Sequence, residues 1–185
     1  MIPSSAASTH PVPIVVMGVS GVGKTTIGIE IARRLGRAFI DADHLHPETN
    51  RRKMESGVPL DDSDREPWLS AVGEAILEET GRGSAPVVAC SALKAEYREL
   101  LRDRCPEIAF VHLDGDPEVI DARLRSRSHE YMPAALLPSQ LQTLEPPIEA
   151  ERAIRIDIES PVDVIASEAI DWLRALESAD TEENR

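Results

Sequence analysis

The stretch Gly18 to Thr25 combines glycines, a lysine and a threonine at a spacing that suits phosphate binding. It reads GVSGVGKT and fits the pattern G-x-x-x-x-G-K-[S/T] at every fixed position, directly after an apolar run. Glycines permit a tight turn in which successive N–H groups face an anion, and the next helix adds partial positive charge. Lys24 can bridge the β- and γ-phosphates of a nucleotide, while the Thr25 hydroxyl can bind Mg²⁺. We expect a nucleotide-phosphate site made of Gly18, Ser20, Gly21, Val22, Gly23, Lys24, Thr25 and Thr26.

Two carboxylates, Asp41 and Asp43, stand in the stretch FIDADHLHP at the end of the next short apolar run. In an extended strand, residues i and i+2 point the same way, and parallel sheets bind ligands at the carboxyl ends of their strands. One carboxylate can hold Mg²⁺ through water while the other accepts a proton from a substrate hydroxyl. The competing interpretation is that one of them only caps the next helix. Beside a phosphate loop, we favour the functional pair.

A phosphate loop alone does not decide between a GTPase, a motor ATPase and a small-molecule kinase. The sequence contains no N-K-x-D stretch, the pattern that reads guanine in GTPases. Its 185 residues are few for a motor ATPase module with its sensor elements. A phosphotransferase is therefore the leading class.

Short apolar runs alternate with helical patterns along the chain. Runs that suit strands covered on both faces occupy residues 12–17, 37–41, 86–90, 107–113 and 153–158. Helical spacing covers residues 25–35, 64–79, 94–104, 117–127 and 162–176, and Ser63 with Glu66 has the spacing of a capping box. Such alternation implies a parallel sheet with right-handed crossovers. We predict an α/β protein, with a five-stranded parallel sheet in a three-layer α/β/α arrangement.

The composition limits the location and partners of the protein. Its net charge of −13 disfavours nucleic acid as a partner, and no apolar run approaches the ~18 residues of a membrane span. The N-terminus lacks the features of a secretory signal, and Cys90 and Cys105 suit two buried thiols in a reducing cytoplasm. We expect a disordered leader at 1–11, a kinase domain at 12–177 and a disordered acidic tail at 178–185.

One segment breaks the alternation of strands and helices. Residues 128–147 contain four prolines and one short helical pattern at 139–144. A segment this long between a helix and a strand suits a mobile lid, and the alternative is an irregular packed excursion. Because it follows a cationic run near a phosphate site, we favour the lid.

Beyond single motifs, the chain resembles the gluconokinase family from about Val12 to Ala166. The resemblance rests on MGVSGVGKTT, FIDADHLHP, NRRKMESGVPLDDSDREPWL, CSALKAEYRELLR, FVHLDGDPEVIDARLRSR and QLQTLEPP, in that order. It implies ATP-dependent phosphorylation of D-gluconate at the 6-hydroxyl, and it suggests a homodimer. In that interpretation Asp43 orients the hydroxyl and acts as base, while Asp41 positions Mg²⁺ together with Thr25. The alternatives are a kinase for another small polyol acid such as shikimate, or an inactive nucleotide-binding regulatory protein.

The same resemblance assigns the basic and polar residues around the two ligands. On the nucleotide side, Arg127 would reach the ATP phosphates and Arg123 would stack over the adenine. Each basic substrate candidate could instead form a surface ion pair, while Trp68 suits the core and Asp114 a structural role. The lid departs from the family pattern, since Glu130 stands where a histidine is expected and His129 precedes it. The substrate-binding candidates are Asp43, His46, Lys53, Arg65, Lys94, Arg98 and Gln140.

Overall fold

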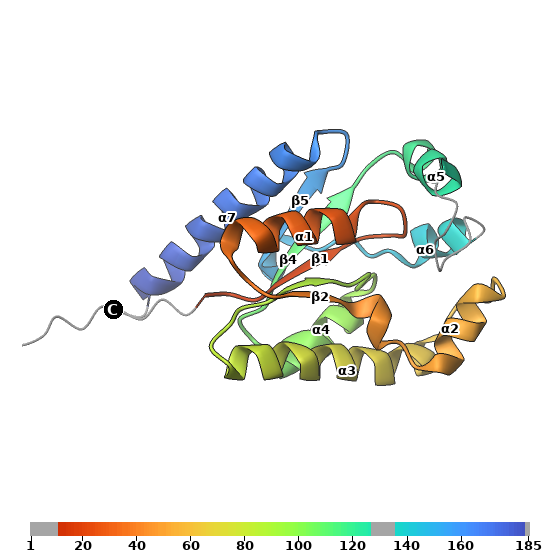
Figure 1. The fold of residues 1–185 in the computed structure, drawn as a ribbon, viewed down its shortest axis with the longest axis horizontal. Coiled ribbons are helices and arrows are strands. Elements are labelled where there is room, and N and C mark those ends of the chain that lie inside the picture. The colour runs from red at the N-terminus through yellow and green to blue at the C-terminus, as the bar shows by residue number, and fades with distance from the viewer. Residues whose placement is uncertain (1–10, 127–135, 184–185) are drawn as a thin grey trace, which may run out of the picture.

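A five-stranded parallel sheet forms the centre of the molecule. The structure, a computed structural model, describes residues 11–126 and 136–183. Within them the strand order is β2-β3-β1-β4-β5, and every neighbouring pair is parallel (Figure 1). The strands are β1 (Ile14–Met17), β2 (Phe39–Asp41), β3 (Val87–Ala89), β4 (Ala109–Asp114) and β5 (Ala153–Asp157). The predicted sheet is therefore confirmed.

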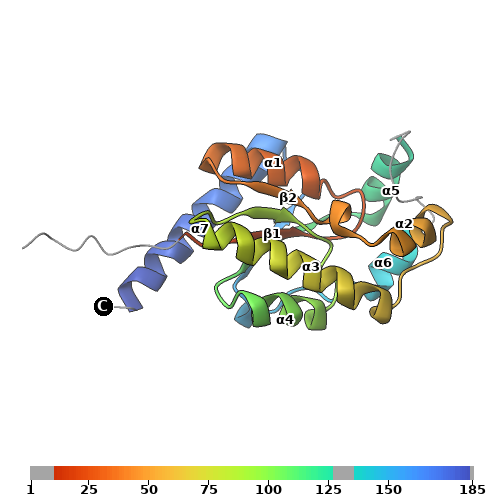
Figure 2. The same ribbon diagram turned by 60° about the horizontal axis from the view of Figure 1, so that its bottom comes forward.

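Helices cover both faces of this sheet, which confirms the three-layer arrangement. On one face lie α1 (Lys24–Leu35) and α7 (Val162–Glu183), and on the other lie α3 (Asp62–Gly81) and α4 (Ala95–Arg104) (Figure 2). Successive residues of β1 enter opposite cores: Val16 packs with the first pair of helices, whereas Val15 packs with the second. This explains why β1 is a continuous apolar run rather than an alternating one.

Three shorter helices stand at the end of the molecule where the strands finish. They are α2 (Glu48–Glu55), α5 (Pro117–Ser126) and α6 (Leu137–Thr143), all at the right-hand end in Figure 1. The connections between described elements include the 3₁₀ turns η1 (Ala42–Leu45) and η3 (Glu149–Glu151). The carboxyl ends of the strands and these helices together frame the site described below.

Several boundaries differ from the sequence expectation. The capping box of α3 is formed by Asp61 and Asp64 rather than by Ser63 and Glu66, so α3 begins two positions earlier than expected. The helix α2 was not predicted. The expected tail at 178–185 is wrong for residues 178–183, because α7 continues through Glu183.

Other expectations fall partly on residues that the structure does not describe. The proposed leader lies outside the described residues except for residue 11, and residues 128–135 of the proposed lid also lie outside them. Within the described part of the lid, α6 confirms the expected short helix. Cys90 and Cys105 are buried free thiols, as expected. Among residues 11–126 and 136–183, no helix has the length and apolar character to cross a membrane.

Candidate active site

The phosphate loop joins β1 to α1 and has the backbone that its glycines predict. Gly18 has a φ of +138°, and a β-carbon there would lie 2.6 Å from the carbonyl oxygen of Leu113. Gly23 occupies the N-cap of α1 with a φ of +99°, a left-handed conformation that favours glycine. No side chain caps this helix and no acidic residue stands in its first turn. The first N–H groups of α1 are thus suited to an anion.

A cavity of about 400 Å³ opens against this loop. From the phosphate loop it is lined by Ser20, Gly21, Gly23, Lys24, Thr25 and Thr26. From the segment after β2 it is lined by Asp41, Asp43, His44 and His46. The predicted candidates Arg65 and Gln140 also line it, together with Arg51, Trp68 and Ser91. The cavity therefore joins the expected phosphate site to part of the expected substrate site.

Asp41 and Asp43 reach the cavity through a turn rather than through one extended strand. The Thr25 hydroxyl donates to Asp41 Oδ2 at 3.2 Å, and the Asp43 backbone N–H donates to Asp41 Oδ1 at 3.1 Å. Both residues line one cavity, as the i, i+2 spacing predicted. The extended backbone assumed in that prediction is wrong for Asp43, because the chain enters η1 directly after Asp41. Asp41 both caps η1 and lines the cavity, so the two interpretations of this residue are compatible.

Two side chains form hydrogen bonds with the backbone of the phosphate loop. The Lys24 ammonium donates to the carbonyl oxygen of Val19 at 3.0 Å. From α6, the Gln140 carboxamide oxygen accepts a hydrogen bond from the Ser20 backbone N–H at 2.6 Å. The helix α6 is thereby held against the loop, which supports the placement of Gln140 at the site.

His46 forms a neutral, buried wall of the cavity. Its ring stacks on Trp68 with centroids 4.1 Å apart and planes 13° from parallel. The Trp68 indole N–H donates to the carbonyl oxygen of Ala42 at 2.7 Å, so the tryptophan belongs to both the core and the cavity wall. Burial, together with the charges of Arg65 and Arg51, lowers the pKa of His46 to about 4. At neutral pH this ring can exchange hydrogen bonds with hydroxyls without carrying charge.

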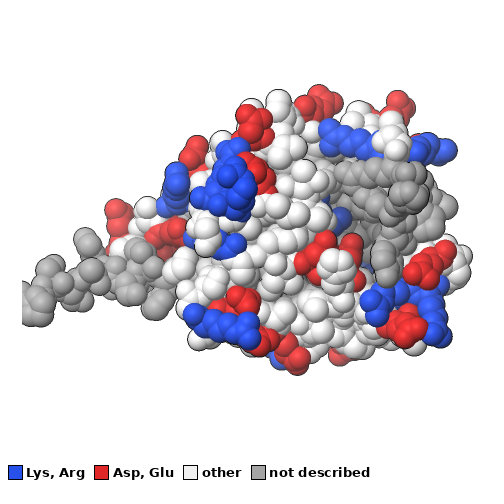
Figure 3. All heavy atoms as spheres, viewed as in Figure 1, with Lys and Arg blue, Asp and Glu red and all other residues white. Residues whose placement is uncertain are grey.

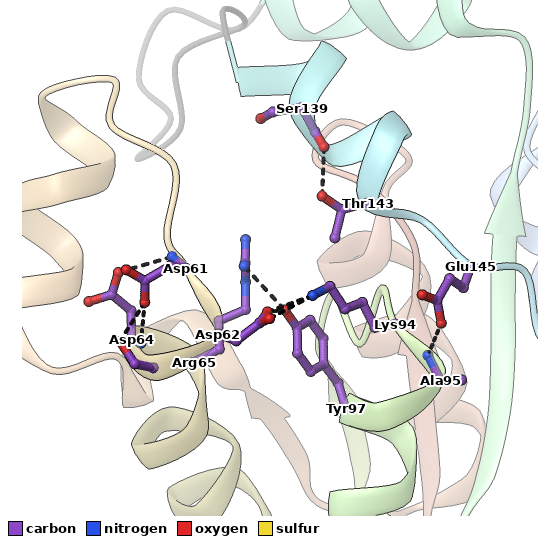
Figure 4. Close-up of polar contacts among 11 residues, drawn as sticks. Asp61, Asp62, Asp64, Arg65, Lys94, Ala95, Tyr97, Ser139, Thr143 and Glu145 are labelled. Atoms are coloured by element: carbon purple, nitrogen blue, oxygen red, sulfur yellow. Dashed lines mark hydrogen bonds and ion pairs between the residues drawn. The ribbon is translucent and has the colours of Figure 1, made fainter.

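The predicted lysines are held by acids at the start of α3 and do not line the cavity. Figure 4 shows the Lys94 ammonium pointing toward Asp62, with which it forms a 2.7 Å ion pair. Lys53 pairs with Asp64 at 2.6 Å. These contacts match the surface-ion-pair alternative, and the structure does not bring either lysine to the substrate site.

Arg65 keeps its place at the cavity through an aromatic contact. Its guanidinium donates to the Tyr97 hydroxyl at 3.2 Å and lies 5.6 Å from the centre of the same ring (Figure 4). The Tyr97 hydroxyl in turn donates to Asp62. Unlike the two lysines, Arg65 lines the cavity with no carboxylate in ion-pair contact among the described residues.

Arg98 pairs with residues of the protein interior and does not line the cavity. The side chain is fully buried and donates to Glu151 at 2.6 Å and 2.9 Å. It also donates to the carbonyl oxygen of Glu145 at 2.9 Å, which fixes the chain that leaves α6. The buried guanidinium lowers the pKa of Glu151 to about 2. Sequence spacing placed Arg98 one turn after Lys94, but its carboxylate partner, Glu151, is 53 positions away in the chain.

The nucleotide-side residues are only partly described. Arg123, on α5, donates to the carbonyl oxygen of Ile158 at 3.0 Å, so α5 lies beside the loop that follows β5. Gly18, Val22 and Arg123 do not line the cavity. Asp114 pairs with Arg155, which agrees with its expected structural role. Arg127 and the lid departure at His129 and Glu130 lie outside the described residues.

Arg51 is the basic cavity residue that sequence reasoning missed. It stands in the run Arg51-Arg52-Lys53, and only a helix over residues 48–55 shows which of the three faces inward. Arg51 and Met54, three positions apart, both line the cavity. An i, i+3 pattern of this kind was the available indication, but the segment is short and carries few apolar residues.

Comparisons with known proteins agree with this geometry. The gluconokinase of Gluconobacter oxydans is 46% identical over 162 residues, which cover 88% of this chain and 91% of that protein. The thermoresistant gluconokinase of Escherichia coli is 39% identical, with 86% and 92% covered. The chain belongs to the gluconokinase family. A solved gluconokinase structure from Sinorhizobium meliloti superposes on this family member with a TM-score of 0.86 at 43% identity, covering 95% of this chain and 99% of that one.

A protein-family model also places the chain in a broader kinase family. A protein-family model described as shikimate kinase matches residues 20–172, so this gluconokinase-family chain belongs to that broader group. A shikimate kinase structure from Bacteroides thetaiotaomicron has a TM-score of 0.61 at 21% identity, covering 88% of this chain and 98% of that one. At that identity the likeness shows the shared fold alone.

Proposed function

We propose that this protein transfers the γ-phosphoryl group of ATP to the 6-hydroxyl of D-gluconate, giving 6-phosphogluconate and ADP. The observation that carries the proposal is that the phosphate loop, Asp43 and Arg65 line one and the same cavity. The chain's membership of the gluconokinase family supports the choice of substrate. Neither a shikimate kinase nor an inactive binding protein is favoured.

The phosphate loop would hold the nucleotide. Its backbone N–H groups and the uncapped start of α1 suit the β- and γ-phosphates, and Lys24 supplies a charge that can follow the transferred group. Arg123 and Arg127 belong to the same proposal, with Arg127 at the phosphates and Arg123 at the adenine. Their roles, and closure of the segment 128–147, rest on the family resemblance.

The donor groups at Thr25 and Asp41 fit Mg²⁺. A hydroxyl and a carboxylate oxygen 3.2 Å apart, beside the phosphate loop, match the preference of Mg²⁺ for few protein oxygens together with nucleotide phosphates. Among the described residues no cluster of three His, Cys, Asp or Glu side chains forms a larger metal site. When bound, the ion would neutralise charge on the β- and γ-phosphates.

Asp43 would orient the attacking hydroxyl. The 6-hydroxyl oxygen forms a bond to the γ-phosphorus, the bond from that phosphorus to the β,γ-bridging oxygen breaks, and ADP leaves. The hydroxyl proton passes to the Asp43 carboxylate. Since phosphoryl transfer depends mainly on positioning and charge neutralisation, a strong base is not required.

The remaining cavity walls would bind the sugar acid. Neutral His46 can hydrogen-bond a hydroxyl, Arg65 supplies positive charge, and Gln140 approaches from α6. A homodimer and a cytoplasmic location are also part of the proposal, and they rest on the family resemblance.

The experiment that tests this function is identification of the product. The purified protein is incubated with ATP, MgCl₂ and D-gluconate, and the phosphorylated carbon is located by ³¹P and ¹³C NMR. We expect 6-phosphogluconate in a 1:1 ratio with ADP. A phosphate on another carbon would contradict the role of Asp43, and no gluconate-dependent product would contradict the function itself.

A further inference from the structure

The cavity is lined by both acidic and basic side chains, which come from different elements. Its carboxylates, Asp41 and Asp43, stand beside the phosphate loop, where Mg²⁺ and the reacting hydroxyl are proposed to lie. Two guanidinium groups, Arg51 from α2 and Arg65 from α3, line the part formed by these two helices. In a chain with a net charge of −13, paired guanidinium groups in one cavity favour a small anion.

We propose that Arg51 binds the carboxylate of the sugar acid together with Arg65 and thereby determines specificity for an acid. This inference rests on the proposed function. Gluconate carries its carboxylate and its 6-hydroxyl on opposite ends of a six-carbon chain. If the 6-hydroxyl lies at Asp43, the carboxylate lies away from the phosphate loop. A planar guanidinium suits a carboxylate because it offers paired N–H donors.

The helix α2 is anchored so that Arg51 faces the cavity. The Asn50 side-chain amide donates to the carbonyl oxygen of Asp64 on α3 at 2.7 Å, and Asn50 and Met54 are buried. Figure 3 shows basic side chains gathered over α2 at the end of the molecule that holds the cavity. Arg51 is half-buried there rather than extended into solvent.

The two basic neighbours of Arg51 are neutralised, whereas Arg51 is not. Arg52 pairs with Glu48 one turn earlier on the exposed side of α2, and Lys53 pairs with Asp64. In the part of the chain that the structure describes, Arg51 has no carboxylate in ion-pair contact. Its charge acts on the cavity, because it helps to keep His46 neutral. A half-buried guanidinium with no carboxylate partner among the described residues, in the cavity that Arg65 also lines, suits the binding of an anion.

The test compares Arg51→Gln with Arg52→Gln, a matched removal of one positive charge from the adjacent exposed position. We expect Arg51→Gln to raise KM for D-gluconate about tenfold or more, because a charged hydrogen bond is lost. We expect kcat to change less than about threefold and KM for ATP to stay constant. Arg51→Lys should lose less affinity than Arg51→Gln, and Arg52→Gln should match the wild type.

Competition with D-glucitol, the neutral alcohol of the same carbon chain, separates carboxylate binding from general damage. Arg51→Gln should leave the inhibition constant of D-glucitol unchanged while KM for gluconate rises. An equal loss for both compounds would overturn the inference, as would an unchanged KM for gluconate. In either case gluconate turnover by the wild type would leave the proposed function standing, whereas a wild type without turnover would overturn both. Thermal unfolding of each variant confirms that the folded proteins are being compared.

Discussion

At the scale of single residues, Asp43 is the proposed acceptor of the proton from the attacking hydroxyl. Asp43→Asn keeps the size of the side chain but removes the proton acceptor and a charge that orients the hydroxyl. We expect kcat to fall about 100-fold or more, within the usual range for a lost acid–base group. Binding of ATP, measured by isothermal titration calorimetry, should persist, since the phosphate loop is untouched.

The control for this variant is Asp103→Asn, at an exposed position on α4 away from the cavity. It removes the same charge and should retain wild-type kcat. Normal turnover by Asp43→Asn would exclude Asp43 as the partner of the hydroxyl, and loss of turnover by both variants would point to net charge instead.

Residues whose roles depend on local backbone could be predicted from the sequence, whereas residues whose roles depend on distant partners could not. Gly18, Lys24 and Thr25 belong to one contiguous stretch, so their spacing was sufficient to predict the backbone of the loop. Lys94 and Arg98 look alike in the sequence. In the structure, Lys94 forms an ion pair with Asp62, whereas Arg98 is buried and forms an ion pair with Glu151. Only the tertiary fold decides which basic residue keeps an unpaired charge.

At the scale of elements, Arg98 links α4 to the chain that leaves α6. Its guanidinium binds Glu151 and the carbonyl oxygen of Glu145, while the Glu145 carboxylate accepts from the Ala95 N–H at 2.8 Å at the start of α4. This connection holds the base of the helix that presents Gln140 to the phosphate loop. The pair is therefore placed to position α6 rather than to bind substrate.

Removal of this guanidinium should reduce stability more than substrate affinity. Arg98→Ala leaves Glu151 buried without its main partner, and we expect a loss of about 3–5 kcal/mol in the free energy of unfolding. Arg104→Ala, at an exposed position on the same helix, should lose less than about 1 kcal/mol. Urea denaturation measures both. A stable Arg98→Ala protein with a raised KM for gluconate would contradict this structural role and favour a contact between Arg98 and the substrate.

Elements themselves were predictable where apolar periodicity was strong. The five strands and the long helices follow from their apolar patterns. The helix α2 has few apolar residues, so its sequence did not predict it, and its buried residues are Asn50 and Met54. The start of α3 was misplaced because Asp61, Ser63 and Asp64 are all good capping residues. Sequence alone does not rank such neighbours.

At the scale of the whole molecule, buried neutral histidines should make stability depend on pH. Burial lowers the pKa of His112, and neither of its ring nitrogens has a hydrogen-bond partner among the described residues. The pKa of His46 is lowered to about 4 by burial and by the charges of Arg65 and Arg51. The unfolded chain takes up these protons near pH 6.5 whereas the folded protein resists them, so unfolding becomes easier as pH falls.

We therefore expect the free energy of unfolding to decline as pH falls from 6.5 toward 4, with His46 contributing at most about 3 kcal/mol. Urea denaturation at pH 7.5, 6.0 and 5.0 measures the decline. His112→Leu should reduce this dependence, because it removes one titrating ring from the core. Equal pH dependence in the wild type and the variant would show that His112 is not responsible.

Selection of D-gluconate as phosphoryl acceptor by the cavity beside the phosphate loop is the central functional proposal for this protein. The most direct measurement is kcat/KM for D-gluconate, shikimate and other polyol acids in a coupled ADP-release assay at fixed ATP and MgCl₂. We predict the highest kcat/KM for D-gluconate and little ADP release without an acid. A higher value for shikimate or another acid, or ADP release that no acid stimulates, would contradict it.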